Sequence, residues 1–311
     1  MSHQTDVSVI LVNWNGCALL ERALSALFTT THKVAMQVIV VDNASSDGSV
    51  AMVRQKFPQT TLLVNSKNVG FARANNQALE LVKGRYILLL NTDAFVHEGT
   101  VDGMVAFMDA HPDAGSVGCR LYYEDGTLQR SCFAFPTLAT ELWNALFLDR
   151  LFSRSRYFGK YQMTYWDMND TRPVDSLMGA CLMVRGDVIR RIGLFDEQFF
   201  MYSEEIDLCY RIQKEGLKNY YFPQVSAIHL WGGSSRRIRR ESFLRLYQSR
   251  VKFFRKHYRE EVVRRYKTIL LFSAFMRISL GMILFFVQRR DDMREIVRDY
   301  GSLLCLSLIH I

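Results

Sequence analysis

The sequence predicts an α/β fold with a mostly parallel, doubly wound sheet, followed by a helical C-terminal extension. Apolar, β-branched runs alternate with helical patterns from residue 7 to residue 93, which is typical of strands joined by crossover helices. Near residue 236 the pattern changes to a basic and then an apolar stretch. The chain has 311 residues, of which 49% are hydrophobic and 23% charged, so it can form one large domain plus an appendage.

Four runs are predicted to form strands, and the first two have the apolar composition of buried parallel strands. They are Val7–Val12, Val38–Val41, Thr61–Val64 and Tyr86–Leu90. Helical spacing predicts helices over residues 17–28, from Ser49 to just before Pro58, and over Gly70–Val82. In open α/β sheets of this kind, ligands bind beyond the carboxyl ends of the strands.

Residues 125–172 interrupt this alternation. The segment is rich in aromatic residues and has weak periodicity, so it is predicted to be an insertion with short helices. It either lines an acceptor site or forms a small aromatic core. Regular patterns return with an apolar run over 177–184, a short helix over 187–192 and a helix over 206–215 that Gly216 ends.

Two aspartates directly follow buried strands. Asp42 ends the second strand, and Asp93 comes three residues after the fourth. A carboxylate at such a position can accept a hydrogen bond from a nucleobase or ribose, or hold Mg²⁺ or Mn²⁺. Each could instead cap the next helix, as Asp often does. Two acids at the mouth of one sheet favour a binding site.

An acidic cluster, Glu204-Glu205-Ile206-Asp207, begins a predicted helix, and His229 follows a later apolar strand. Acids at a helix start are stabilised by the helix dipole, which is a purely structural explanation. Crowded carboxylates also raise each other's pKa, which suits a general base working near neutral pH. A histidine at a strand end beside basic residues is a candidate metal or phosphate ligand.

Several motifs, in this order along the chain, resemble glycosyltransferase family 2 and within it the rhamnosyltransferase-like branch. The resemblance covers about residues 6–235. The motifs are VSVILVNWN (7–15), VVDNASSDGS (40–49), NVGFARANN (68–76), LLLNTD (88–93), GLFDEQFFMY (193–202) and EEIDLCYR (204–211).

The resemblance implies a GT-A nucleotide-diphospho-sugar transferase fold over residues 1–235 and an inverting reaction that uses Mg²⁺ or Mn²⁺. Glu205 would be the catalytic base, and Asp93 and His229 the metal ligands. The nucleotide-sugar site would consist of Val12, Asn13, Asp42, Asn68, Gly70, Arg73, Asn91 and Thr92.

Two positions depart from the family's pattern. Asn91 replaces the first Asp of a DxD motif, so fewer protein carboxylates would hold the metal; the Asn-Thr-Asp form resembles the branch that uses dTDP-sugars, with UDP-sugars as the alternative. Glu205 stands where the family usually has Asp, which makes Glu204 a second candidate for the base.

The C-terminal extension, residues 236–311, starts with basic residues interleaved with aromatic ones and continues with an apolar run from Thr268 to Val287. That run has the length of a bilayer span, but Arg277 near its centre would cost at least about 2.5 kcal/mol. A helix lying in the interface of an anionic membrane fits this composition better. A buried amphipathic helix or a homodimer contact is the alternative. The last residues, 305–311, show no structural signature.

Together these features predict an enzyme that transfers a sugar, with rhamnose from dTDP-rhamnose as the first candidate, to a glycan or a polyprenyl-linked glycan. The N-terminus lacks the pattern of a signal peptide, and the net charge is +8, so we expect a cytoplasmic enzyme at the inner membrane face. No nucleic-acid-reading motif accompanies the charge. A non-catalytic sugar-nucleotide-binding protein and a sugar-phosphate nucleotidyltransferase are the alternative functions.

Overall fold

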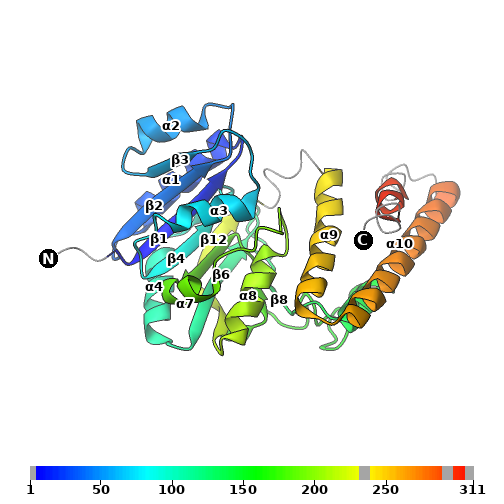
Figure 1. Ribbon diagram of the computed structural model, residues 1–311. Coiled ribbons are helices and arrows are strands. Elements are labelled where there is room, and N and C mark those ends of the chain that lie inside the picture. Colours follow the sequence, from blue (N-terminus) through cyan, green and yellow to red (C-terminus); the bar gives the residue numbers. More distant parts are fainter. Residues whose placement is uncertain (1–4, 231–238, 289–296, 305–311) are drawn as a thin grey trace. The chain divides into compact units, whose positions relative to one another are not determined.

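The computed structural model describes residues 5–230, 239–288 and 297–304 (Figure 1). The chain divides into two compact units. The larger unit contains Met1–Phe133, Met168–Phe200 and Glu204–Arg236, and the smaller contains Ala134–Asp167, Met201–Ser203 and Arg237–Ile311. Most of the predicted insertion and the predicted C-terminal extension therefore contribute to the same small unit. Residues 236–238 and 305–311 lie outside the described part of the chain.

A mixed, mostly parallel sheet forms the larger unit, as predicted (Figure 1). Its strand order is β3-β2-β1-β4-β11-β6-β12-β5. Strands β1 to β4 are parallel to one another, whereas β11 runs antiparallel between β4 and β6. The main strands are β1 (Val7–Asn13), β2 (Met36–Asp42), β3 (Thr61–Val64), β4 (Tyr86–Leu90), β5 (Ala94–Val96), β6 (Ala114–Tyr122), β11 (Cys181–Arg185) and β12 (Lys218–His229). The short strands are β7 (Leu128–Gln129), β8 (Cys132–Phe133), β9 (Arg172–Val174) and β10 (Ser176–Leu177).

Helices of this unit bury an apolar face against the sheet. Leu20, Leu24 and Leu27, spaced at three and four residues on α1, join the core formed by the strands. Helix α2 ends at Lys56, two residues before Pro58, as the steric restriction on the residue before proline predicts. The helices are α1 (Cys17–Thr30), α2 (Ser49–Lys56), α3 (Phe71–Leu79), α4 (Thr100–Ala110), α7 (Gly186–Ile192) and α8 (Glu204–Lys214).

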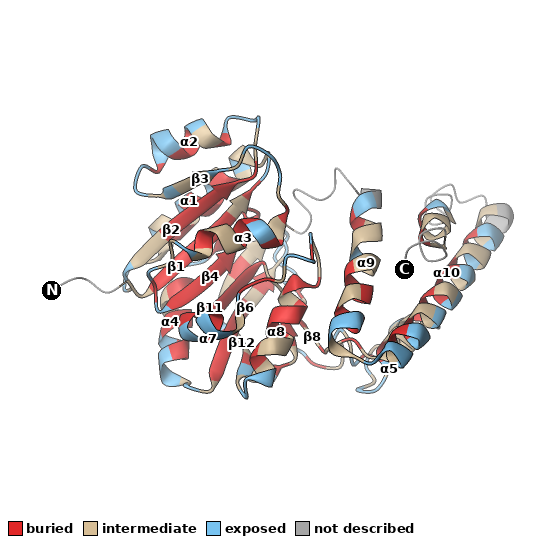
Figure 2. Ribbon diagram, viewed as in Figure 1, coloured by how far each residue is buried: buried red, intermediate tan, exposed pale blue. Residues whose placement is uncertain are grey.

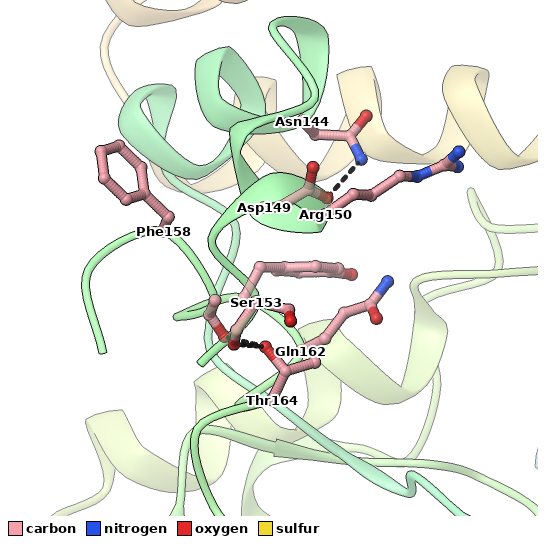
Figure 3. A pocket seen from close by; sticks show the side chains of 9 residues that line it. Asn144, Asp149, Arg150, Ser153, Phe158, Gln162 and Thr164 are labelled. Atoms are coloured by element: carbon pink, nitrogen blue, oxygen red, sulfur yellow. Dashed lines mark hydrogen bonds between the residues drawn. The ribbon is translucent and has the colours of Figure 1, made fainter. Parts of the chain in front are cut away.

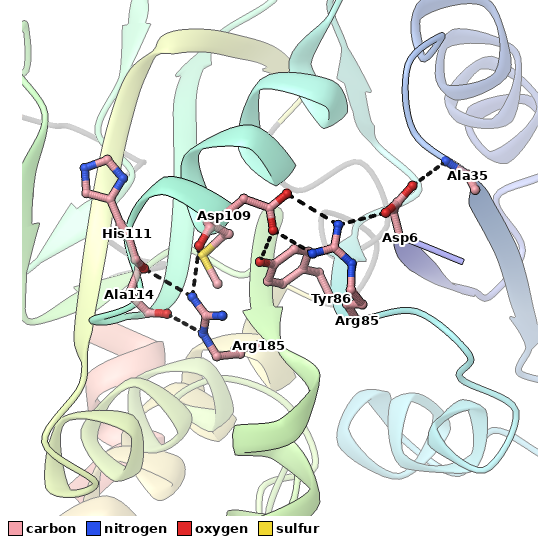
Figure 4. A network of polar contacts seen from close by, with 9 residues as sticks. Asp6, Ala35, Arg85, Tyr86, Asp109, His111, Ala114 and Arg185 are labelled. Carbon is pink, nitrogen blue, oxygen red and sulfur yellow. Dashed lines mark hydrogen bonds and ion pairs between the residues drawn. The ribbon is translucent and has the colours of Figure 1, made fainter. Parts of the chain in front are cut away.

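A polar network ties α4 to the strand ends opposite the candidate site (Figure 4). Arg85 donates hydrogen bonds to Asp6 and Asp109 at 2.8 and 2.6 Å, and the Tyr86 hydroxyl donates to Asp109 at 2.7 Å. The Arg85 guanidinium lowers the pKa of both carboxyl groups. Arg185 donates to three backbone carbonyls around the end of α4. These contacts fix the amino ends of β1 and β4, and hence the register of the strands whose other ends carry the site residues.

The smaller unit is helical, apart from irregular segments. It contains α5 (Leu138–Ala145), α6 (Leu148–Leu151), α9 (Arg239–His257), α10 (Glu260–Gln288) and a helical turn over 297–304. Its core joins Phe254 of α9 to a stripe on α10 and to Leu303. Both long helices carry buried and exposed residues along their length (Figure 2). The short helices in 134–167 confirm the expectation of helical structure in that segment.

An ion pair lies inside the smaller unit. Arg250 of α9 is 9% exposed and contacts Glu141 of α5 at 3.3 Å and the Tyr161 hydroxyl at 2.6 Å. Burial raises the pKa of Glu141 despite the attraction of Arg250. Breaking one partner of such a pair leaves a buried charge uncompensated, so the pair specifies how α9 packs on α5.

Candidate active site

One corner of the site lies where β1 and β2 end together. Asn13 and Asp42 are paired in register, and Asn13 Nδ2 donates to Asp42 Oδ2 and to Ser45 Oγ, both at 3.0 Å. Asp42 Oδ1 accepts from the Ser45 backbone N–H at 2.8 Å. Asn13 Oδ1 is buried and has no hydrogen-bond partner in the structure. A buried orphan acceptor calls for a donor from outside the chain, and a nucleobase N–H is such a donor.

Thr92 lies close to this corner. A Cβ atom added at Gly16 would sit 3.0 Å from Asn13 Oδ1 and 3.9 Å from Thr92 Oγ1. The side chains of Asn13 and Thr92 therefore both approach Gly16 closely. Val12 is half-buried on β1 beside Val41. The structure therefore brings together the predicted binding residues at the ends of β1, β2 and β4.

A second group surrounds Gly70, which begins α3. Gly70 has φ +91°, and an added Cβ would lie 2.8 Å from the Phe200 ring, so only glycine fits here. Its N–H donates to Asn68 Oδ1 at 2.9 Å, and its carbonyl accepts from Asn43 Nδ2 at 3.3 Å. Asn43 follows Asp42, which joins this loop to the first corner. Arg73 is more exposed and lies 3.8 Å from Glu197.

Asp93 and His229 form a buried pair. His229 Nε2 lies 3.4 Å from Asp93 Oδ1, and the residues are 5% and 6% exposed. Strand pairing positions them, because His229 faces Ala94 in the β12–β5 register and the Leu230 N–H donates to the Asp93 carbonyl at 3.0 Å. The two predicted metal ligands are thus adjacent in the fold, although 136 positions separate them in the sequence.

Gln129 determines which nitrogen of His229 faces Asp93. Its side-chain nitrogen donates to the His229 carbonyl at 3.4 Å, so its Oε1 accepts from His229 Nδ1–H at 2.7 Å. In the neutral imidazole, Nε2 then presents a lone pair to the Asp93 carboxylate. A carboxylate oxygen and an imidazole nitrogen are both ligands of divalent metals, so this pair can contribute to a metal site. Among the described residues there is no group of three or more His, Cys, Asp or Glu side chains that could hold a metal.

The two glutamates of the acidic cluster differ in their surroundings. Glu204 is 6% exposed, and its Oε2 atom is buried without a hydrogen-bond partner. Burial and then the neighbouring charge of Glu205 raise the pKa of Glu204. Glu205 is half-buried. Asp207 is fully buried and forms an ion pair at 2.8 Å with Arg211, one turn later on the same helix. Its role is therefore to stabilise α8.

Glu205 lies near the end of β4. A Cβ added at Gly179 would be 3.6 Å from Glu205 Cβ, and the carbonyl of the next residue, Ala180, accepts from the Asn91 N–H at 3.0 Å. Gly179 and Ala180 therefore connect the acidic cluster to the Asn91-Thr92-Asp93 turn. This connection places the candidate base near the turn that carries Asp93.

Replacing Glu204 by Gln is expected to stabilise the protein increasingly as pH rises. A carboxyl whose folded-state pKa is raised contributes stability that is full below its unfolded pKa of about 4.3 and is lost as pH rises through the folded value. The amide does not titrate, so the Tm of the variant relative to the native protein should increase between about pH 5 and pH 8. Thermal unfolding across that range measures it, with the exposed Glu80→Gln as control. A difference in Tm that is independent of pH would contradict the buried, proton-binding state of Glu204.

Sequence reasoning missed Gln129, Gly16 and Gly179. Gln129 fixes the His229 tautomer from the two-residue strand β7, and no local pattern around it indicates that role. Gly16 matters because a Cβ atom there would lie 3.0 Å from Asn13 Oδ1, and Gly179 matters because it faces Glu205 at an ordinary contact distance. A glycine four residues after the end of the predicted strand Val7–Val12 was a usable signal for Gly16.

A separate cavity of about 180 Å³ lies within the smaller unit (Figure 3). It is lined by Asn144, Asp149, Arg150, Ser153, Phe158, Gly159, Tyr161, Gln162 and Thr164. Asn144 Nδ2 donates to Asp149 Oδ2 at 3.0 Å, whereas Asp149 Oδ1 is buried without a hydrogen-bond partner. Aromatic rings mixed with amide, carboxylate and guanidinium groups form a lining that suits a polyhydroxylated ligand.

The chain belongs to glycosyl transferase family 2, whose model matches residues 8–171. It is similar to the N-acetylglucosaminyl-diphospho-decaprenol L-rhamnosyltransferase of Mycobacterium tuberculosis, with 29% identity over 237 residues that cover 72% of this chain and 76% of that protein. It is also similar to rhamnosyltransferase WbbL of Escherichia coli, with 29% identity over 168 residues, 51% of this chain and 60% of that one. These findings confirm the resemblance to the family and to its rhamnosyltransferase-like branch.

Solved structures share the fold. A mannosyltransferase from Pyrobaculum calidifontis, in complex with GDP-Man and Mn²⁺, superposes with a TM-score of 0.59 at 17% identity, covering 99% of this chain and 87% of that one. GalNAc-T7 with UDP, GalNAc and Mn²⁺ gives a TM-score of 0.55 at 14% identity, covering 80% and 50%. The predicted GT-A fold is confirmed, and the protein is a glycosyltransferase.

Proposed function

We propose that this protein is an inverting, metal-dependent glycosyltransferase that extends a glycan in cell-envelope polysaccharide synthesis. The observation that carries the proposal is the connection of Glu205, through Gly179 and Ala180, to the Asn91–Asp93 turn, whose Asp93 lies 3.4 Å from His229. Relatives named as rhamnosyltransferases support rhamnose as the transferred sugar and a lipid-linked glycan as the acceptor.

The donor is a nucleotide-diphospho-sugar, with dTDP-rhamnose as the first candidate and UDP-sugars as the alternative. Asn13 and Asp42 bind the nucleobase. Asn13 has a buried side-chain oxygen without a hydrogen-bond partner, and Asp42 has a carboxylate at the end of its strand. Asn68, Gly70 and Arg73 flank this corner, with Val12 at its edge, and Asn91 and Thr92 contact the sugar and diphosphate.

Asp93 and His229 would hold Mg²⁺ or Mn²⁺. When bound, the ion neutralises negative charge on the departing nucleoside diphosphate. The mixed oxygen and imidazole donor set favours Mn²⁺ over Mg²⁺. The solved structures with this fold that contain Mn²⁺ support a divalent ion here.

Glu205 supplies the acid–base chemistry. Its carboxylate accepts the proton of the acceptor hydroxyl as that oxygen bonds to the anomeric carbon. The bond from the anomeric carbon to the diphosphate oxygen breaks at the same time, and its electron pair leaves with the nucleoside diphosphate. A single displacement of this kind inverts the anomeric configuration. Glu204, deeper and with a raised pKa, keeps a proton more readily and is the second candidate for the base.

The cavity of the smaller unit is our candidate for binding a distal part of the acceptor glycan. Arg150→Ala and Gln162→Ala are each expected to raise the acceptor KM by roughly tenfold, the cost of one or two lost hydrogen bonds. Donor affinity should not change. Steady-state kinetics with varied acceptor measures the effect, and Arg154→Ala, an exposed arginine outside the cavity lining, is the control. An unchanged acceptor KM in both cavity variants would remove this cavity from the acceptor site.

We place the enzyme at the cytoplasmic face of the cell membrane, where a polyprenyl-linked acceptor is found. Helix α10 supports this placement, because the segment Glu260–Phe285 is long and apolar enough to cross a membrane by length and composition. Such a helix also occurs in soluble proteins, and a homodimer contact is its other use.

Incubation with a panel of dTDP-, UDP- and GDP-sugars tests the function. We expect a Mn²⁺-dependent thermal shift that is largest with dTDP-rhamnose, and release of dTDP when a lipid-linked N-acetylglucosamine acceptor is added. Release of pyrophosphate would show a nucleotidyltransferase. Donor binding with no transfer to any acceptor would show a non-catalytic binding protein.

A further inference from the structure

Helix α10 has two opposite faces with different surroundings. Its inner face, Val263, Tyr266, Leu270, Ala274 and Arg277, is buried in the smaller unit. Its outer face carries large apolar side chains in contact with solvent, with Phe275 63%, Ile283 57%, Met282 43% and Phe272 41% exposed. At 100° per residue these two sets lie on opposite sides of the helix.

The contacts of Arg277 hold the inner face of α10 against the rest of the smaller unit. Its guanidinium donates to the backbone carbonyl and the side-chain oxygen of Asn144 at 2.9 and 3.0 Å, and it lies 4.6 Å from the Phe147 ring. Ser273 is a further partner. An arginine in the middle of an apolar run would be costly in a bilayer. Here its guanidinium has hydrogen-bond partners in α5 and contacts the loop after that helix. A bilayer-spanning α10 would have to lose these contacts or carry α5 into the hydrocarbon.

The outer face is basic at its start and apolar afterwards. Arg264 and Arg265 are exposed in the first two turns, and Arg255, Lys256 and Arg259 are exposed just before the helix, against the exposed acids Glu260 and Glu261. Cations followed by a one-sided apolar stripe are typical of helices that lie in the interface of an anionic bilayer.

We propose that α10 docks the enzyme on anionic lipid by lying in the plane of the membrane, with Phe272, Phe275, Met282 and Ile283 inserted. Arg264 and Arg265 contact the headgroups, and Arg277 stays inside the protein. This inference deepens the proposed membrane placement and rests on it. Charge complementarity selects a lipid surface over a second copy of the chain, because a copy packed on this face would bring further cations to a region that already has an excess of them.

The full-length protein is mixed with vesicles of phosphatidylcholine, with and without phosphatidylglycerol, and bound protein is sedimented. Phe275→Ser is expected to weaken binding to anionic vesicles by about tenfold, through loss of buried apolar area. The matched control is Leu151→Ser, which changes a 73% exposed side chain of the same unit and should bind normally. Met282→Ser combined with Ile283→Ser repeats the test with other residues of the outer face.

Replacing both Arg264 and Arg265 by Gln should weaken binding by roughly tenfold or more, and only on anionic vesicles. Arg54→Gln with Arg190→Gln makes the same change in net charge at exposed positions of the larger unit and should have little effect. Alkaline carbonate should release the native protein from vesicles, because an in-plane helix does not cross the bilayer. Resistance to carbonate would overturn the in-plane mode in favour of a span.

Oligomeric state and transfer to a soluble acceptor analogue separate the remaining outcomes. A dimer that Phe275→Ser converts to a monomer, without vesicle binding by either form, would assign the outer face to a second copy. Absence of vesicle binding with intact transfer to the soluble analogue would reject the docking and retain the enzyme. Absence of transfer to that analogue would instead reject the proposed function.

Discussion

Glu205→Gln is expected to lower kcat for sugar transfer by roughly 10²–10⁴-fold, the usual contribution of a positioned general base. The substitution keeps the size of the side chain beside Gly179 and removes its ability to take a proton. Donor affinity should be retained, because the residues proposed to bind the nucleotide lie at the ends of β1 and β2. Steady-state transfer rates and calorimetric titration with the donor measure the two quantities separately.

Glu204→Gln is the matched comparison, since it makes the same chemical change one residue earlier. Burial and the Glu205 charge raise the pKa of Glu204, so the neutral amide mimics a form that the native side chain adopts readily. We expect kcat to fall by less than about tenfold. If the two variants show the opposite order, Glu204 is the base and Glu205 its neighbour. If both retain full activity, neither carboxylate takes the proton.

Much of the fold was predictable because the larger unit consists of regular elements with strong patterns. The strand predicted over Tyr86–Leu90 matches β4, and the strand predicted over Thr61–Val64 matches β3. Both runs are apolar and bounded by polar or glycine-containing segments. The antiparallel direction of β11 was not predictable, because an apolar run such as Cys181–Arg185 has the same pattern in either direction.

The candidate site was predictable as a set of residues and not as a geometry. Asp93 and His229 are adjacent because β12, which ends at His229, pairs with β5, which follows Asp93. Local sequence patterns do not encode this long-range pairing. Gln129 shows the limit most clearly, since its role depends on a two-residue strand and on a carbonyl 100 positions away.

Arg277 is a case in which structure changes the interpretation of a sequence feature. In the sequence it is a charge in the middle of an apolar run, which weighs against a helix that spans the bilayer. In the fold it is 8% exposed and bound to Asn144, so this charge is confined to one side of α10, and the large apolar side chains of Phe272, Phe275, Met282 and Ile283 are exposed on the other side. Sequence periodicity alone could not show this, because the residues that satisfy Arg277 lie more than 100 positions earlier.

Asp93→Ala is expected to weaken Mn²⁺ binding by more than about 100-fold and to lower kcat by at least as much. Even residues that only orient a metal ligand contribute 10–100-fold to affinity, and a bound divalent ion supplies several kcal/mol of charge stabilisation, at 1.4 kcal/mol per factor of ten. Removal of metal from the native enzyme by a chelator should reproduce the loss, and added Mn²⁺ should restore the native enzyme but not the variant. Calorimetric titration of Mn²⁺ in the presence of nucleoside diphosphate gives the affinity.

Gln129→Leu tests the same site through the tautomer of His229. It removes the acceptor that fixes the proton on Nδ1, so both proposed ligands remain but Nε2 is no longer held as a lone-pair donor. We expect Mn²⁺ affinity to fall by roughly 10–100-fold, with activity recovering at high Mn²⁺ concentration, which a ligand deletion at Asp93 does not permit. Asp113→Ala, an exposed acid paired with Lys218, should leave metal affinity unchanged. Full activity of Asp93→Ala in the presence of a chelator would show that the reaction does not use a metal at this pair, and the buried Asp93–His229 contact would then have a structural role only.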